Sequence, residues 1–163
     1  MMAEVVDIND IQMLLDQGKD PKEIFAYVED ENENNILCVC LGDKMWNFLK
    51  VPENKLVCSD WYRLTLPFSE GFGIVRRNDD RWNFVKPDGS MLCSDWYEYV
   101  TDFNDGFGIV KRSSDCKYNF VKPDGRLLSN KWYLRIIEFK DGFAKVLTDD
   151  GWRYIGTTGK MVD

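Results

Sequence analysis

The chain has 163 residues, of which 44% are hydrophobic and 30% charged, and this balance favours a folded protein over a disordered one. It contains no histidine, so the Ser-His and Cys-His nucleophile pairs and the commonest zinc ligand are excluded. The net charge of −7 is concentrated in residues 1–35, which hold ten acidic and two basic side chains. The nearly neutral remainder lacks the basic footprint of a nucleic-acid-binding protein.

Two short helices are predicted at the start of the chain. Asp7 can cap the first helix, which ends near Gly18, and residues 20–23 read as a cap followed by Pro at the first position of the second helix. Residues 29–33 read as a solvated linker. We interpret residues 1–34 as an acidic helical cap on the array that follows. The apolar faces of the two helices are predicted to be Ile8, Ile11, Leu14 and Leu15, then Ile24, Phe25 and Val28.

A unit of about 36 residues is repeated roughly three times after Met45. The strings WNFLK, WNFVK, YNFVK and WRYIG begin in steps of 36, 36 and 34 residues. The pair Trp-Tyr and the string Phe-x-x-Gly-Phe also recur once per unit, in constant order. Three landmarks in the same order predict a repeat array over residues 35–163. Its units start near 46, 82 and 118, and a partial unit starts at 152.

Each unit is predicted to hold three short strands. In the middle unit the first strand is WNFVK, the second runs through LCSDWYEY and the third is GFGIV. The segment KPDG at 86–89 and 122–125 predicts a type I turn with a bulge, in which the Gly has a left-handed backbone conformation. In the corresponding turns of the first and last units, Asn54 and Gly159 can adopt the same conformation. Residues 36–41 would be a lone third strand. The predicted fold is mainly β, with tandem antiparallel units in an open solenoid-like stack, or alternatively a closed barrel or propeller-like arrangement.

Alternation along the strands predicts which aromatic side chains face the core. In the first strand we expect the Trp82 and Phe84 face to be buried, with Asn83 on the other side. The two rings of each Trp-Tyr pair must also point to opposite faces. If the Trp points inward, the tyrosines form a row that could bind a ligand or pack against the next sheet. The candidate binding residues are therefore Tyr62, Tyr97 and Tyr133.

The remaining reactive side chains predict neither catalysis nor a metal site. Cys58 and Cys93 occupy one repeat position, and Ser129 replaces them in the third unit, which favours a small, partly buried filler over a catalytic thiol. Asp60 and Asp95 are likewise repeat equivalents. We expect no enzyme, no cofactor and no metal. The number of cysteines is odd, and none of them has CxxC spacing. The sequence also shows no signal peptide and no membrane span, so we predict a cytoplasmic protein with reduced thiols.

The string WNFVKPDGSMLCSDWYEYVTDFNDGFGIV resembles the WG-type repeats, a family of tandem β units found mostly in bacterial proteins. The resemblance spans residues 36–163, although Asn47, Asn83, Asn119 and Arg153 stand where the family has Gly. It implies an interaction or scaffold role without an activity. We therefore predict a non-catalytic module that binds another protein or a peptide, with no nucleic-acid or membrane partner. The alternatives are a carbohydrate-binding module that uses the same aromatics and a carboxylate-based hydrolase with two acids in a cleft.

Overall fold

The computed structural model describes residues 6–162, which form two helices and fourteen strands. All strand pairs in it are antiparallel, and the strands make four small sheets, none of which closes on itself. The predicted mainly β fold with a small N-terminal helical element is confirmed, and the described residues form no closed barrel. By their contacts the residues divide into an N-terminal unit, residues 6–80 and 85–90, and a C-terminal unit, residues 81–84 and 91–162.

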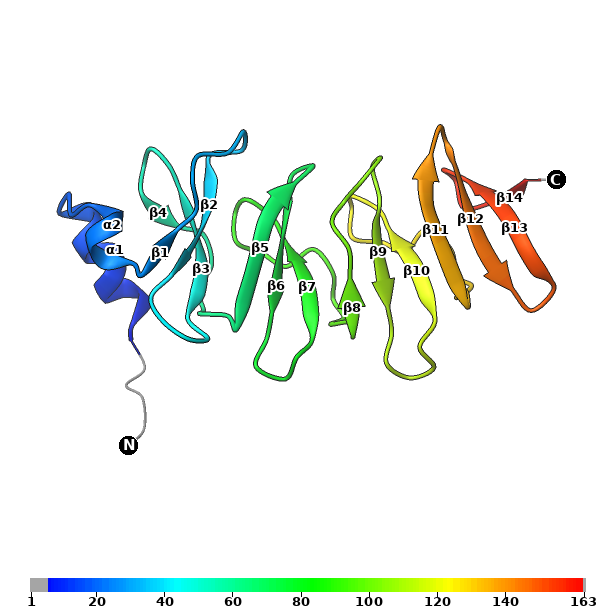
Figure 1. Cartoon of the computed structure of the whole chain (residues 1–163), viewed down its shortest axis with the longest axis horizontal. Coiled ribbons are helices and arrows are strands. Elements are labelled where there is room, and N and C mark those ends of the chain that lie inside the picture. The colour runs from blue at the N-terminus through cyan, green and yellow to red at the C-terminus, as the bar shows by residue number, and fades with distance from the viewer. Residues whose placement is uncertain (1–5, 163) are drawn as a thin grey trace. The chain divides into compact units, whose positions relative to one another are not determined.

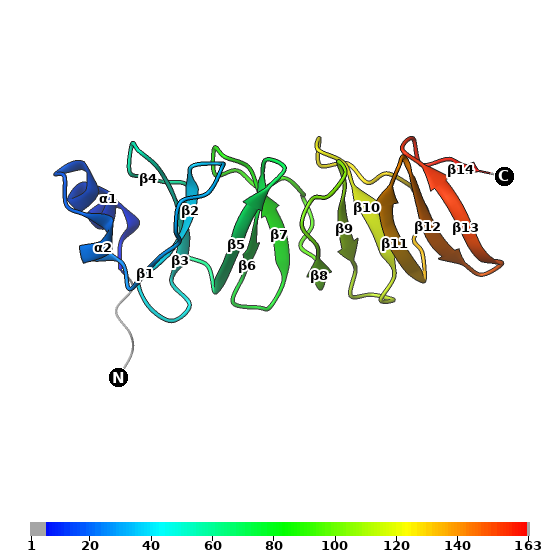
Figure 2. The same ribbon diagram turned by 45° about the horizontal axis from the view of Figure 1, so that its top comes forward.

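The N-terminal unit begins with the two predicted helices, α1 (Ile8–Asp16) and α2 (Pro21–Ile24). The Asp7 carboxylate caps α1 by accepting a 2.8 Å hydrogen bond from the Asn9 amide. Both helices lie beside the first sheet (Figures 1 and 2) and share one core with it. That sheet has the order β1-β2-β3-β4 and consists of β1 (Tyr27–Val28), β2 (Ile36–Cys40), β3 (Trp46–Lys50) and β4 (Lys55–Leu56).

The second helix is shorter than predicted. It ends at Ile24, because Phe25 has extended backbone angles, and Tyr27–Val28 continues as strand β1. Tyr27 pairs with Cys40 and Val28 with Val39, so β1 covers the outer edge of β2. The expectation that Val28 belongs to a helical face was wrong, since an aromatic and a β-branched residue beside an open strand edge favour pairing over a second helical turn. Strand β2 is consequently not a lone strand.

The three remaining sheets repeat one pattern. An outer strand, six residues long in the second and fourth sheets and two in the third, turns back into a central strand. A polar loop then leads to the strand that contains the WNF or YNF string, or WRY in the fourth sheet. The second sheet is β5 (Leu64–Ser69), β6 (Phe72–Arg76) and β7 (Trp82–Val85), with β7 divided between the two units. The third is β8 (Tyr99–Val100), β9 (Gly108–Lys111) and β10 (Tyr118–Val121). The fourth is β11 (Arg135–Lys140), β12 (Phe143–Thr148), β13 (Gly151–Gly156) and β14 (Met161–Val162).

The predicted turn chemistry is present at both kinds of turn. Asn54, Gly89, Gly125 and Gly159 all have φ between 56° and 88°, and the Gly125 amide donates a 2.9 Å hydrogen bond to the Lys122 carbonyl. The Glu/Asp-Gly pairs at 70–71, 105–106 and 141–142 have positive φ at both residues, as a type I′ hairpin turn requires. Gly125 has a second role, because a Cβ there would collide with the backbone carbonyl of Leu92 in the preceding repeat.

The strand predicted through LCSDWYEY is broken in every unit. Only an isolated bridge marks Tyr97, which pairs with Trp82, and the next strand starts at Tyr99. The break is caused by a buried asparagine ladder, Asn47, Asn83 and Asn119, each fully shielded from solvent. The Asn83 amide nitrogen donates to the Cys93 carbonyl (2.8 Å) and the Asp95 carbonyl (3.3 Å), and its oxygen accepts from the amides of Cys93 (3.2 Å) and Phe84 (2.7 Å). Side-chain hydrogen bonds therefore replace the strand ladder there.

Both faces of the WNF strands are buried. Phe48, Phe84 and Phe120 are fully shielded and each meets a second phenylalanine edge-on at 4.8–4.9 Å between ring centroids. The prediction that Phe84 faces the core is confirmed, but the expectation that Asn83 faces away from a core was wrong. The Trp position is only half-buried in the first three strands, and Trp152 is 44% exposed.

Candidate binding surfaces

The structure does not place the three predicted tyrosines in an open row. Tyr97 and Tyr133 are 6% and 2% exposed, and Tyr62 is half-buried, with its phenol pKa raised to about 12 mainly by burial. Tyr133 belongs to a core cluster with Phe120 and Phe139, and its hydroxyl donates to the Ser129 hydroxyl at 3.0 Å. The buried rings of Tyr97 and Tyr133 do not fit the exposed platform that was the first of the two alternatives. The alternative, packing against the next sheet, fits Tyr97, whose ring lies 6.3 Å from that of Trp132.

Four of the five cysteines are buried packing residues rather than reactive groups. Cys58 and Cys93 are 2% and 5% exposed, which confirms the prediction of buried fillers, and burial raises the pKa of both thiols to about 12. All five cysteines are free thiols, and only Cys116 is exposed. No group of three or more Cys, Asp or Glu residues suited to a metal ion occurs within residues 6–162. Over the same stretch, no helix has both the length and the apolar character needed to cross a membrane.

Exposed apolar side chains gather on one face of the fourth sheet. Antiparallel pairing puts Tyr154 beside Lys145 and Trp152 beside Leu147, and directly paired residues point to the same side of a sheet. The Lys145 ammonium lies 5.2 Å from the centre of the Tyr154 ring. We call this surface the terminal-sheet face. Its exposed members are Ile137 (51%), Phe143 (49%), Trp152 (44%), Tyr154 (50%) and Val162 (39%), with Arg135 and Lys145 among them.

The same repeat position is covered in the third sheet. Phe107 is the counterpart of Phe143, and its ring stacks on that of Phe139 with 4.3 Å between centroids. Phe107 is half-buried as a result, whereas no described residue covers Phe143 in this way. The terminal-sheet face therefore presents the kind of surface that a neighbouring β-element buries elsewhere in the array.

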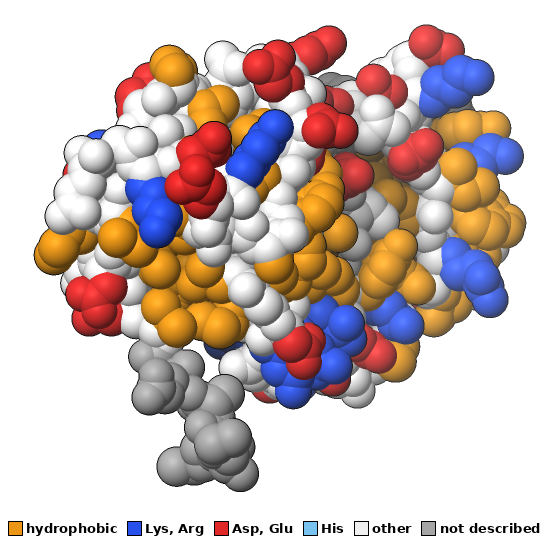
Figure 3. Space-filling view, turned by 60° about the vertical axis from the view of Figure 1, so that its left-hand side comes forward, with side chains coloured by type: hydrophobic (Ala, Val, Ile, Leu, Met, Phe, Trp, Pro, Cys, Tyr) orange, Lys and Arg blue, Asp and Glu red, His pale blue; other side chains and the backbone are white. Residues whose placement is uncertain are grey.

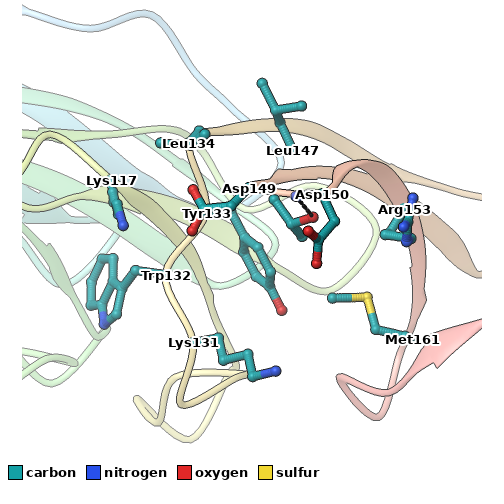
Figure 4. Close-up of a pocket in the computed structure, with 11 residues that line it drawn as sticks. Lys117, Lys131, Trp132, Tyr133, Leu134, Leu147, Asp149, Asp150, Arg153 and Met161 are labelled. Carbon is teal, nitrogen blue, oxygen red and sulfur yellow. Dashed lines mark hydrogen bonds between the residues drawn. The ribbon is translucent and has the colours of Figure 1, made fainter.

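A pocket of about 510 Å³ lies at the turn between β12 and β13 (Figure 4). Trp132 and Tyr133 lie on one side of it, and Arg153 and Met161 lie on the other. Asp149 and Asp150 are consecutive residues of the turn, so the pocket does not bring together two acids from different strands. Besides these residues, the lining consists of Lys117, Lys131, Leu134, Leu147 and Thr148.

A second pocket, of about 1,020 Å³, lies in the N-terminal unit between the start of α1 and the turn around Trp61. The Trp61 indole donates a 2.9 Å hydrogen bond to the Val6 carbonyl and so fixes the start of α1 against the sheet. Three carboxylates, those of Asp7, Asp43 and Asp60, lie on its wall. Figure 3, viewed from the side of the helices, shows hydrophobic and acidic side chains interspersed on this unit.

No protein-family model matches the sequence, and no curated protein does. Solved structures do match. Two computationally designed proteins, Ika8 and Ika4, are each 14% identical with a TM-score of 0.45; the matches cover 83% and 79% of this chain, and 47% and 88% of theirs. Hsv2 from Kluyveromyces lactis is 12% identical with a TM-score of 0.50, and the match covers 86% of this chain and 51% of that protein. The chain thus spans about half the length of Ika8 and of Hsv2. At such identities the likeness concerns the fold alone.

Proposed function

We propose that this chain is a non-catalytic protein-binding module built from WG-type repeats, and that the terminal-sheet face is the surface that contacts its partner. The observation that carries the proposal is the clustering of Ile137, Phe143, Trp152 and Tyr154 on one face, each 44–51% exposed. Contiguous apolar patches with large aromatic side chains are typical of protein interfaces. Scattered single exposed hydrophobics would not support the same conclusion.

The charge on this face favours an acidic partner surface. Arg135 and Lys145 lie on this face, where Lys145 pairs with Ile137 and Tyr154, and Arg135 pairs with Leu147 at the sheet edge. Neither residue forms an ion pair shorter than 4.0 Å with a described residue, so both cations are available to a partner. Complementary charge at the rim of an apolar patch accelerates association and orients the partner. We therefore infer a folded partner that presents an apolar surface bordered by carboxylates.

The test compares Phe143→Ser with the matched control Tyr99→Ser, because both residues are about half exposed and lie in the C-terminal unit. Partners captured by the wild-type chain are identified, purified and titrated against each variant by calorimetry. Loss of a central exposed aromatic at an interface weakens binding by about thirtyfold or more, whereas Tyr99→Ser should leave it unchanged. Equal affinity of the two variants for every purified partner would refute the proposal.

A carbohydrate-binding module is the second candidate, and the pocket in Figure 4 favours it. There Trp132 lies beside two carboxylates and three cationic side chains, which could stack on a sugar ring and bind its hydroxyls. Tryptophan fluorescence measured against a glycan panel decides this alternative. A saturable fluorescence shift that is lost in Trp132→Ala would support carbohydrate binding. No shift with any glycan of the panel would exclude it.

We place the interaction in the cytoplasm, because all five cysteines are free thiols and four of them are buried. Thiol titration of freshly isolated, denatured protein should give five free thiols per chain. Disulfides in the isolated protein would contradict this localisation.

A further inference from the structure

We propose that the pocket at the β12–β13 turn and the adjoining edge of β13 bind an extended peptide from a partner protein, with an acidic residue next to a tryptophan. This inference goes beyond the proposed function, because it concerns a second site. The pocket lining includes none of the five exposed apolar residues of the terminal-sheet face, and the two sites share only the backbone edge at Trp152. It rests on how the array binds its own Trp-Tyr segments. The pocket and the edge both belong to the C-terminal unit.

Each WNF or YNF strand pairs its first residue with the tyrosine of a Trp-Tyr segment. Tyr118 and Tyr133 exchange two backbone hydrogen bonds of 2.8 Å, and the pairs Trp46 with Tyr62 and Trp82 with Tyr97 do the same at 2.8 and 2.9 Å. These three pairs show that the edge of such a strand accepts an extended segment at this position.

Trp152 holds the same position in β13, but no tyrosine pairs with it in the described part of the chain. Its carbonyl instead accepts a 3.0 Å hydrogen bond from the Arg153 guanidinium. The short strand β14 pairs only with Tyr154 and Ile155, so it leaves the edge of β13 open at Trp152. An extended peptide can add to an edge of this kind through main-chain hydrogen bonds.

One repeat earlier, a tryptophan fills the place that corresponds to the pocket. The Trp132 ring lies 6.3 Å from the Tyr97 ring, and the Arg112 guanidinium lies 4.3 Å from its centre. The counterparts of Tyr97 and Arg112 one unit later are Tyr133 and Thr148, and both line the pocket. The pocket therefore stands where the array itself holds an indole, which makes tryptophan the side chain that fits it.

The charges of the pocket favour an acidic residue beside that tryptophan. Lys117, Lys131 and Arg153 line it, against Asp149 and Asp150. Arg153 takes the place of the ladder asparagines, which donate to backbone carbonyls and also accept from backbone amides. A guanidinium only donates, so it suits a carboxylate or carbonyl oxygen of the incoming segment. The array's own segments at 59–61 and 94–96 read Ser-Asp-Trp, with the acid just before the ring.

The occupant is a partner protein rather than a second folded copy. In this chain the candidate rings, Trp61, Trp96 and Trp132, are half-buried, and the tyrosine that follows each is bonded to its own strand. A second copy could offer such a segment only by unfolding part of its array. A partner with an exposed acidic and aromatic segment bears no such cost.

The probe is a fluorescein-labelled synthetic peptide, MLSSDWYEYV, which reproduces residues 91–100 with Cys93→Ser. Polarisation should show saturable binding to the full chain, and a peptide carrying Asp95→Ala and Trp96→Ala should bind about thirtyfold more weakly. Arg153→Glu should weaken binding of the first peptide about fivefold, whereas the matched reversal Arg126→Glu, on an exposed turn, should not. Bound peptide should also slow hydrogen exchange at the Trp152 amide.

Equal binding of the two peptides, an unchanged affinity in Arg153→Glu, or an unaltered exchange rate at Trp152 would overturn the proposal. Self-association of the chain that Arg153→Glu abolishes would overturn it too, because the occupant would then be a second copy. The variant Phe143→Ser separates this proposal from the proposed function. It should weaken binding of the folded partner by about thirtyfold or more and leave peptide affinity intact, so either idea can fail alone.

Discussion

The asparagine ladder makes a strong prediction about stability, best tested at Asn83. The substitution Asn83→Ala removes four hydrogen bonds between 2.7 and 3.3 Å that a fully buried side chain makes to backbone groups of Phe84, Cys93 and Asp95. Each such bond contributes about 1 kcal/mol, and buried groups left without partners cost more. Allowing for partial relaxation, we expect a loss of about 3 kcal/mol, which lowers Tm by about 6–12 °C in a chain of this size.

Denaturant unfolding followed by tryptophan fluorescence measures this loss. Asn83→Leu is the informative companion, because it restores volume but none of the hydrogen bonds, and it should be destabilised at least as much as Asn83→Ala. Asn104→Ala is the control, since its side-chain hydrogen bond to Glu138 is exposed and should change stability by less than about 0.5 kcal/mol. A loss below about 1 kcal/mol in Asn83→Ala, or near-normal stability in Asn83→Leu, would show that the ladder does not hold the segment in place.

Three further predictions concern other parts of the chain. Gly125→Ala should cost about 3 kcal/mol and Gly142→Ala only about 1 kcal/mol in equilibrium unfolding, because the two have similar positive φ but only the first meets a backbone carbonyl. Native protein at pH 8 should react rapidly with a thiol reagent at one site per chain, and Cys116→Ser should abolish that phase, since the other four thiols are buried. Hydrogen bonds from Arg112 lower the pKa of Asp115 to about 2; a carboxyl NMR titration should show this value return toward about 3.9 in Arg112→Ala. Because that folded-state pKa lies below the unfolded one, the pair stabilises the fold at neutral pH and stops doing so as pH falls toward 2.

The architecture was predictable because turn residues and repeat spacing act locally. Positive φ angles are adopted by few residues other than glycine, so they were expected at the glycine of each KPDG turn and at the Glu/Asp-Gly pairs. The structure has positive φ at each of these positions. The burial of Phe84 was also predictable, since alternation along the strand places its ring on the face chosen for the core. The helix cap at Asp7 was predictable for the same reason, because its carboxylate bonds to the amide of Asn9, only two residues away.

The candidate site was not predictable in the same way, because it depends on contacts between segments. Alternation in an unbroken strand put Tyr97 and Tyr133 on the outer face only if the tryptophan of each pair points inward. In the structure the asparagine side chains interrupt that strand, and both tyrosine rings are buried. The string WNF contains the signal that the sequence analysis missed. An Asn that recurs between two aromatic residues of a strand needs hydrogen-bond partners for its side-chain amide if it is buried. The terminal-sheet face gives no sequence signal of its own. Phe143 and Phe107 occupy the same position of the Phe-x-x-Gly-Phe string, but only Phe107 is covered by a neighbouring ring.

Site-specific photo-crosslinking tests the central claim, that the terminal-sheet face binds a protein partner, most directly. A benzoylphenylalanine residue replaces Phe143 in one variant and Tyr99 in the other, two positions with nearly equal exposure. Each variant is irradiated in the cells that produce the chain, and the adducts are identified by mass spectrometry. We predict one dominant adduct from position 143 that is absent at position 99, and that the protein in it binds the purified wild-type chain. No adduct at position 143, or the same adducts from both positions, would contradict the account.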